Sequence, residues 1–122
     1  MKIQPDISSA QTIQSYGPGW VQVAGEKIMH SVVIGSGGEQ LNWNCRQFED
    51  LQASHFEQLA QLKPELVVFG SGARQRFVSA SLTRALIERQ IGLETMDTPA
   101  ACRTYNILVG EGRRVAVALL MQ

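Results

Sequence analysis

The chain has 122 residues, equal numbers of basic and acidic side chains (11 each), and two cysteines. A chain of this length buries roughly two thirds of its unfolded surface, so it needs no disulfide or metal to be stable. We therefore expect one domain over residues 1–122. The zero net charge argues against a general electrostatic grip on nucleic acid or on an anionic membrane.

The N-terminal residues 1–6 lack the apolar core of a signal peptide. The longest apolar run, residues 115–121, is far shorter than the ~20 residues that cross a bilayer. We expect a cytoplasmic protein without membrane insertion. In a reducing compartment the widely separated Cys45 and Cys102 are expected to be free and packed. No histidine has partners at ligand spacing, so we predict no metal site.

The first half of the chain predicts antiparallel strands joined by short turns. A turn signal at residues 16–20 leads into a strand at 21–23, and residues 24–27 form the next turn. Residues 28–34 are rich in β-branched side chains, and residues 41–43 suggest a third short strand. This order predicts an N-terminal β-meander.

The pattern then changes to a helical period. Ser54 and Glu57 match a capping box, and the helix they begin is expected to stop before Pro64. Residues 66–69 are apolar on both faces, which is typical of a central strand covered by helices.

Residues 82–89 predict a second helix, with Gly92 at its C′ position, followed by a strand at 93–96. Thr98 and Pro99 are typical of a helix start. The last strand, residues 113–121, alternates valines with alanines. The whole order predicts an α/β domain with helices packed on a mixed sheet.

Two strand ends are candidate binding sites, because ligands of open α/β sheets bind beyond the carboxyl ends of strands. The first is Gly70-Ser71-Gly72, followed by Arg74 and Arg76. Exposed amides and guanidinium groups in such a loop suit a carboxylate or phosphate. The motif is neither a Walker A nor a dinucleotide fingerprint, so a plain strand-exit turn is the alternative.

The second strand end is Asp97-Thr98, at a predicted helix start. Ordinary helix capping, favourable by about 1 kcal/mol, is one explanation. A catalytic carboxylate would need a second acid, a base or a metal beside it, and the neighbouring sequence offers none.

The last helix carries polar side chains near a thiol. Arg103 and Asn106 share a helix face, and Arg114 follows the helix-ending glycine. These side chains form either a solvated surface or a clamp for a partner or an anion. A helix N-terminus would lower the pKa of Cys102, whereas burial would make the thiol inert.

Several blocks resemble the Mth-type domain family of uncharacterised proteins. They cover nearly the whole chain in order and are residues 15–21 (SYGPGWV), 31–34 (SVVI), 64–72 (PELVVFGSG), 97–108 (DTPAACRTYNIL) and 111–116 (EGRRVA). The resemblance implies a three-layer α/β fold whose central mixed sheet has its last strand antiparallel to the others. It also implies relatives that include a mitochondrial complex I assembly factor and an adipogenesis-associated protein, and no established catalytic activity or cofactor.

The leading hypothesis is a non-enzymatic binding or assembly module with an arginine-lined polar edge. Its candidate residues are Gly70, Ser71, Gly72, Arg76, Asp97, Thr98, Arg103, Asn106 and Arg114. The partner would be a protein or an anionic small molecule, and not nucleic acid. The alternative is an enzyme or carrier that binds a carboxylate or phosphate compound at the same edge. The charge distribution supports an arginine-rich edge, since residues 65–122 carry seven arginines against five acidic side chains.

Overall fold

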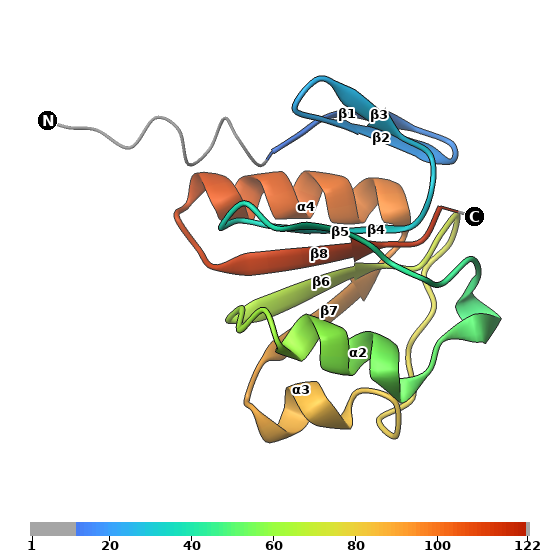
Figure 1. The fold of residues 1–122 in the computed structure, drawn as a ribbon, viewed down its shortest axis with the longest axis vertical. Coiled ribbons are helices and arrows are strands. Elements are labelled where there is room, and N and C mark those ends of the chain that lie inside the picture. The colour runs from blue at the N-terminus through green and yellow to red at the C-terminus, as the bar shows by residue number, and fades with distance from the viewer. Residues whose placement is uncertain (1–11, 122) are drawn as a thin grey trace, which may run out of the picture.

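The computed structural model describes residues 12–121. Along the chain its elements are β1 (Ile13–Gly17), β2 (Trp20–Val23), β3 (Glu26–Ile28), β4 (Val32–Gly35), β5 (Gln40–Asn42), the 3-10 helix η1 (Phe48–Asp50), α2 (Ala53–Ala60), β6 (Leu66–Gly70), α3 (Arg84–Glu88), β7 (Gly92–Met96), α4 (Thr98–Gly110) and β8 (Val115–Leu119). Figure 1 shows their arrangement.

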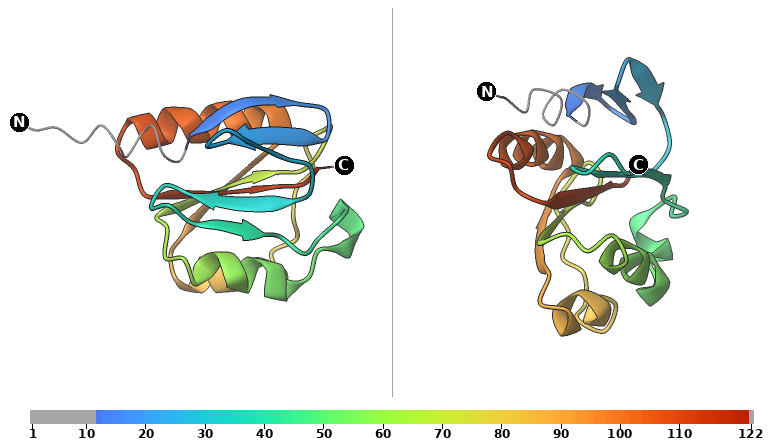
Figure 2. Two further views of the ribbon diagram at one scale, coloured as in Figure 1. Left: turned by 45° about the horizontal axis from the view of Figure 1, so that its top comes forward. Right: turned by 60° about the vertical axis from the view of Figure 1, so that its left-hand side comes forward.

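The strands form two sheets within the mixed α/β architecture that the sequence predicted. β1, β2 and β3 make a small antiparallel sheet, and the central sheet has the order β5-β4-β8-β6-β7. The small sheet and α4 cover one face of the central sheet, and α2 and α3 cover the other (Figures 1 and 2). The fold is therefore a mixed α/β architecture in layers, with an N-terminal antiparallel sheet.

The direction expected for the last strand is wrong. β8 pairs parallel with β6, and it is antiparallel only to β4. β4 is itself antiparallel to β5, so β4 is the strand that opposes its neighbours on both sides. The reason is the crossover through α4, which returns the chain to the starting edge and makes β7 and β8 run the same way.

The predicted meander is divided between the two sheets. The expected strand at residues 28–34 ends as β3 at Ile28 and resumes as β4 at Val32. At the break, the carbonyl of Ser31 accepts from the amide of Trp43, 3.0 Å away. β1, at the start of the described chain, was not predicted. The turn at Ala24 and Gly25 is present, and both residues have positive φ (52° and 80°), which is typical of a type I′ hairpin turn.

Two predicted helix ends are also corrected. The capping box of α2 is formed by Gln52 and His55, and not by Ser54 and Glu57. Gly92 is the first residue of β7, while Gln90 takes the left-handed conformation (φ 58°) after α3. Here the tertiary structure shifts each boundary by two residues, a distance that local sequence signals do not resolve.

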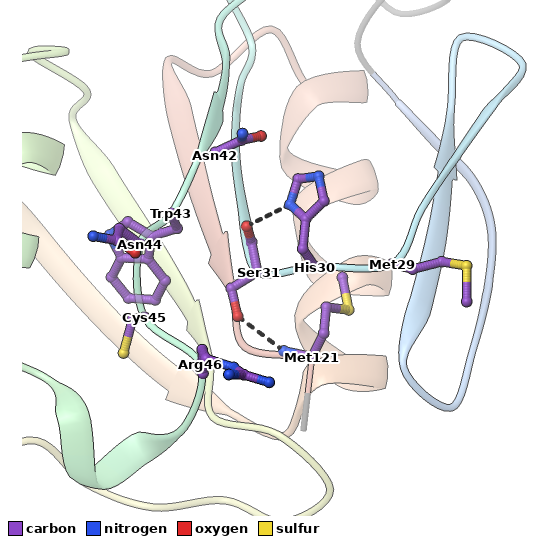
Figure 3. Close-up of a pocket in the computed structure, with 9 residues that line it drawn as sticks. All are labelled: Met29, His30, Ser31, Asn42, Trp43, Asn44, Cys45, Arg46 and Met121. Atoms are coloured by element: carbon purple, nitrogen blue, oxygen red, sulfur yellow. Dashed lines mark hydrogen bonds between the residues drawn. The ribbon is translucent and has the colours of Figure 1, made fainter.

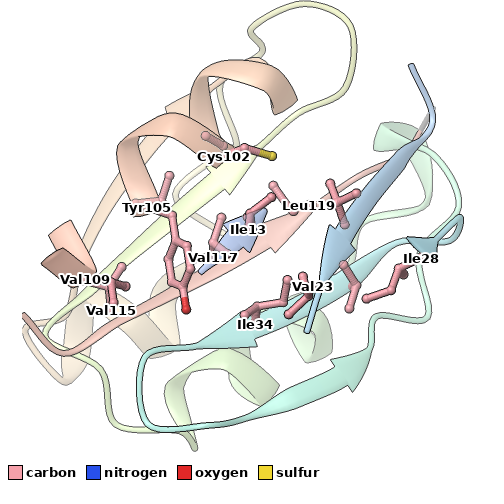
Figure 4. Packing of buried hydrophobic residues seen from close by; sticks show 14 residues of the cluster. Ile13, Val23, Ile28, Ile34, Cys102, Tyr105, Val109, Val115, Val117 and Leu119 are labelled. Atoms are coloured by element: carbon pink, nitrogen blue, oxygen red, sulfur yellow. The ribbon is translucent and has the colours of Figure 1, made fainter. Parts of the chain in front are cut away.

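A hydrophobic core lies on each face of the central sheet. On β8, Val117 and Leu119 face α4 and the small sheet, whereas Ala118 and Leu120 face α2 and α3. Figure 4 shows the core on the α4 side, where side chains from both sheets meet the helix. The predicted alternation of the last strand and the double-sided burial of residues 66–69 are thus confirmed.

Candidate functional site

The two candidate strand ends lie side by side. β6 and β7 are parallel neighbours, with Gly70 opposite Met96. The amide of Ser71 donates to the carbonyl of Met96 (2.9 Å). The glycine loop and the start of α4 therefore share one edge of the central sheet, as predicted from the carboxyl ends of the strands.

Thr98 connects this edge internally. Its buried hydroxyl accepts from the amide of Gly72 (2.9 Å) and donates to the carbonyl of Leu120 (2.8 Å). The amide of Thr98 in turn donates to the carbonyl of Gly72 (2.8 Å). One side chain thus joins the ends of β6 and β8 to the first turn of α4.

The glycines permit this close approach. A Cβ atom at position 70 would lie 3.0 Å from Thr98 Cα and from Leu119 Cδ2, closer than packed carbon atoms normally approach. Gly72 has a φ of +100°, a conformation that favours glycine. Both positions are therefore explained by backbone packing.

The amides of the glycine loop already have partners. The Ser71 and Gly72 amides donate to Met96 and Thr98. The hydroxyl of Ser71 accepts from the amide of Arg76 (2.9 Å) and donates to the carbonyl of Arg74 (2.7 Å). An anion could bind the Ser71 and Gly72 amides only by breaking these hydrogen bonds, and its own hydrogen bonds would have to compensate for the ones lost.

Asp97, and not Thr98, is the N-cap of α4. Its Oδ1 accepts from the amide of Ala100 (2.8 Å), and Pro99 follows in the first turn. A carboxylate at this position also interacts favourably with the positive end of the helix dipole. The capping explanation for Asp97 is thus confirmed.

The arginines do not form one edge. Arg76 pairs with Glu49 of η1 (2.8 Å). Arg103 donates to the Tyr16 hydroxyl (3.0 Å), a contact that raises the pKa of the guanidinium. Arg114 precedes β8 and so lies at the opposite end of the strand from the glycine loop; its Nε donates to the carbonyl of Lys63 (3.1 Å).

Asn106 has a structural partner. Its Oδ1 accepts from the amide of Ile13 (2.8 Å), and its Nδ2 donates to the carbonyl of the same residue (2.9 Å). The side chain fastens β1 to α4. Asn106 and Arg114 therefore do not belong to the strand-end cluster, by which we mean the loop Gly70-Ser71-Gly72 with Asp97 and Thr98.

An apolar groove of about 380 Å³ opens beside that cluster. We call it the strand-end groove, and its lining is Tyr16, Gly17, Pro18, Gly19, Gly72, Ala73, Thr98, Pro99, Leu120 and Met121. Only Gly72 and Thr98 of this lining were predicted. The turn between β1 and β2 supplies the opposite wall. Its signal in the sequence was the block at residues 15–21, which had no site assigned to it.

A second, more polar cavity of about 610 Å³ lies at the same end of β8. Figure 3 shows its lining, in which the Ser31 hydroxyl accepts from the amide of Met121 (3.3 Å). His30 Nδ1 donates to the carbonyl of Ser31 (3.0 Å). Met121 lines both hollows, so the end of the last strand separates them.

Both cysteines are free and buried, as predicted. They lie in different cores, on opposite faces of the central sheet. Burial raises the pKa of Cys102 to about 12, outweighing the opposite effect of Arg103. Burial, with a smaller contribution from Asp50, raises the pKa of Cys45 to about 11. Neither thiol is activated, since a nucleophilic cysteine needs a lowered pKa.

None of the helices that the structure describes combines the length and the apolar character that spanning a membrane requires.

Comparison with known proteins identifies relatives along almost the entire chain. Human NADH dehydrogenase (ubiquinone) 1 alpha subcomplex assembly factor 3 is 31% identical over 127 residues, covering 97% of this chain. The chain spans 65% of the length of that relative. A crystal structure from Bordetella parapertussis is similar with a TM-score of 0.86 and 39% identity, covering 92% of this chain and 96% of the other.

The family assignment agrees with these likenesses. A solution structure from Bordetella pertussis, described as a Mth938-like domain, has a TM-score of 0.84 and 32% identity, covering 98% of this chain and 92% of the other. Residues 13–120 match the family described as a protein of unknown function (DUF498/DUF598). The resemblance read from the sequence is thus confirmed, and the chain belongs to the DUF498/DUF598 family, with a Mth938-like fold.

Proposed function

We propose that this protein is a non-enzymatic binding module that docks a protein partner in the strand-end groove and contributes to the assembly of a complex. The observation that carries the proposal is the groove itself, an apolar hollow of about 380 Å³ at the sheet edge where α/β folds bind ligands. The assembly role in the relatives' name belongs to those proteins. It supports protein binding here by analogy, because one fold hosts many functions.

The chemistry of the lining favours a protein surface over a reacting substrate. Pro18, Ala73 and Pro99 line the groove and are exposed, and removing their apolar surface from water on binding is favourable. The titratable side chain in the lining, Tyr16, is held by Arg103. A partner segment with small apolar side chains would fill the groove without breaking its hydrogen bonds.

Arg103 adds polar specificity at the rim. Its guanidinium is exposed, and Tyr16 orients it. Charged groups at the rim of an interface act mainly on association rate and on partner choice. We expect the partner to place an acidic side chain beside Arg103.

A blocked groove tests the proposal. Ala73→Trp adds an indole to the lining, and Ala80→Trp adds the same group to an exposed position of the same loop outside the groove. Tagged wild-type protein and both variants are expressed in native cells, and retained proteins are quantified by mass spectrometry. We expect a reproducible partner that Ala73→Trp loses and Ala80→Trp keeps. Equal retention by all three proteins would refute docking in the groove.

A carboxylate or phosphate compound at the same edge is the competing function. A thermal-shift screen with inorganic phosphate, nucleotides, sugar phosphates and organic acids separates it from protein docking. Binding at 100 times Kd would stabilise the fold by about 2.7 kcal/mol. We expect no shift, because the Ser71 and Gly72 amides are engaged. A shift that Arg103→Gln abolishes would instead favour a carrier or an enzyme.

The cytoplasmic location stays a prediction.

A further inference from the structure

The segment between β6 and α3, residues 71–83, contains neither helix nor strand but is fastened at several points. The Ser71 hydroxyl accepts from the amide of Arg76 (2.9 Å). The side-chain amide of Gln75 donates to the carbonyl of Thr95 on β7 (2.9 Å). Long segments without regular structure are commonly functional, and these bonds give this one a defined conformation.

The neighbours of Phe77 are fixed against the body of the protein. Arg76 Nη1 lies 2.8 Å from Glu49 Oε2, and its guanidinium carbon is 5.1 Å from the centre of the Phe48 ring. On the other side, Val78 packs against the core under α2 and α3. Phe77 is therefore held between two anchored residues.

Phe77 itself is 78% exposed. Its benzyl group exposes a large apolar area to water, and covering this area with a partner is favourable. Because its neighbours hold the backbone, little conformational entropy is lost when a partner covers the ring. Aromatic side chains and arginines are enriched at protein interfaces.

The charged residues that flank Phe77 along the chain all have the same sign. Residues 71–84 contain three arginines and no acidic residue, and Glu49 pairs with Arg76. Arg74 and Arg84 are exposed and form no ion pair within the described residues. A complementary surface must therefore combine an apolar socket with carboxylates at its rim.

We propose that Phe77 is the anchor of a second protein-binding surface, whose partner supplies an apolar socket flanked by acidic residues. A membrane is the less suitable occupant, because even a single myristoyl chain binds bilayers only marginally and each additional arginine contributes only about 1 kcal/mol. This inference rests on the proposed protein-binding function but uses a surface separate from the lining of the strand-end groove.

Site-specific photocrosslinking identifies what contacts the ring. Phe77 is replaced by p-benzoylphenylalanine in the full chain, and Ile107, which is 62% exposed on α4, is replaced in the same way as the control. After irradiation in native cells, adducts are identified by mass spectrometry. We expect a protein adduct at position 77 that is absent at position 107, on a peptide with apolar and acidic residues. A lipid adduct, or no adduct specific to position 77, overturns the proposal.

The partner identified by crosslinking is then purified, and its affinity for this protein and for variants of it is measured. We expect Phe77→Ala to weaken binding about 10- to 30-fold, as for a hot-spot residue, and the pair Arg74→Glu with Arg84→Glu to weaken it in a salt-dependent way. Ile107→Ala and Arg46→Glu change exposed residues elsewhere and should bind as wild type. Unchanged affinity of Phe77→Ala refutes the proposal.

The groove variant separates the two proposals. If Ala73→Trp loses its partner while Phe77→Ala binds as wild type, this inference fails and the proposed function stands. If neither substitution changes retention or affinity, both fail. Melting temperatures of the variants, which should equal that of wild type, exclude misfolding as the cause of any loss.

Discussion

The side chain of Asn106 binds both backbone polar groups of Ile13. Its Nδ2 donates to the carbonyl at 2.9 Å, and its Oδ1 accepts from the amide at 2.8 Å. An asparagine placed in this way imitates the neighbouring strand that β1 lacks on that side. This contact joins the small N-terminal sheet to α4, and β1 and its turn complete the strand-end groove.

We expect Asn106→Ala to destabilise the protein by about 2 kcal/mol, because the amide and carbonyl of Ile13 lose their partners. Urea unfolding followed by circular dichroism measures the change. The control is Asn42→Ala, at an exposed position of β5, which should stay within about 0.5 kcal/mol of wild type. Equal effects of the two substitutions would contradict the role given to Asn106.

Thr98→Val keeps the shape of the side chain and removes the hydroxyl that Gly72 and Leu120 share. We expect a loss of about 2–3 kcal/mol, since two buried backbone groups lose their partners. Thr98→Ser keeps the hydroxyl and should cost only about 1 kcal/mol for the lost methyl group. If Thr98→Ser were the more damaging change in chemical unfolding, the methyl and not the hydroxyl would matter here.

Gly70→Ala places a Cβ 3.0 Å from the backbone of Thr98, which cannot move without shifting α4. We expect a destabilisation of about 1–3 kcal/mol, typical of overpacking. Gly110→Ala is the matched control: a Cβ there meets no atom within 4 Å, and alanine is the better helix former by about 1 kcal/mol. The two substitutions should thus change the melting temperature in opposite directions.

The buried thiols should react only when the protein unfolds. Alkylation with iodoacetamide at pH 8 should leave Cys45 and Cys102 unmodified in the native protein and modify both in urea. Modification of Cys102 at the rate of a free thiol would show that the thiol is accessible and activated, contrary to its burial.

The same thiols predict a decline of stability at high pH. Their folded pKa values, about 11 and about 12, lie above the ordinary value of 9.0. A raised acid pKa means that the unfolded state loses its protons first, so this contribution is complete below pH 9 and falls as the pH approaches 11 to 12. Urea midpoints between pH 8 and 11 measure the decline, and Cys102→Ala should show less of it than wild type does.

Local patterns predicted those parts of the fold that one stretch of chain can encode. The alternation at residues 115–121 predicted that β8 is buried on both faces, because side chains of a strand point to opposite sides in turn. Thr98 and Pro99 predicted the start of α4 to within one residue, since caps act within one helical turn. The division between β3 and β4 left no such signal, because it depends on which sheet each half joins.

The contact partners of the arginines could not be predicted from the local sequence either. Arg76 meets Glu49, and Arg103 meets Tyr16, across many intervening residues. A charge pattern reports how many arginines a segment has, but the contacts of each guanidinium depend on the packing of distant elements. The arginines that were expected to share one edge therefore contact different parts of the protein, whereas the glycine loop does lie beside the start of α4.

The sequence by itself determined the class of the fold, the two-sided burial of the central strands and the membership of the family, because periodicity and motif order are properties of the chain. The tertiary structure alone decided the direction of β8 relative to its neighbours, the opposite wall of the strand-end groove and the exposure of Phe77. Each of these depends on contacts between residues far apart along the chain. The zero net charge argues against general nucleic-acid binding, which stays a prediction, whereas only the structure shows that Arg74, Arg84 and Phe77 are all exposed.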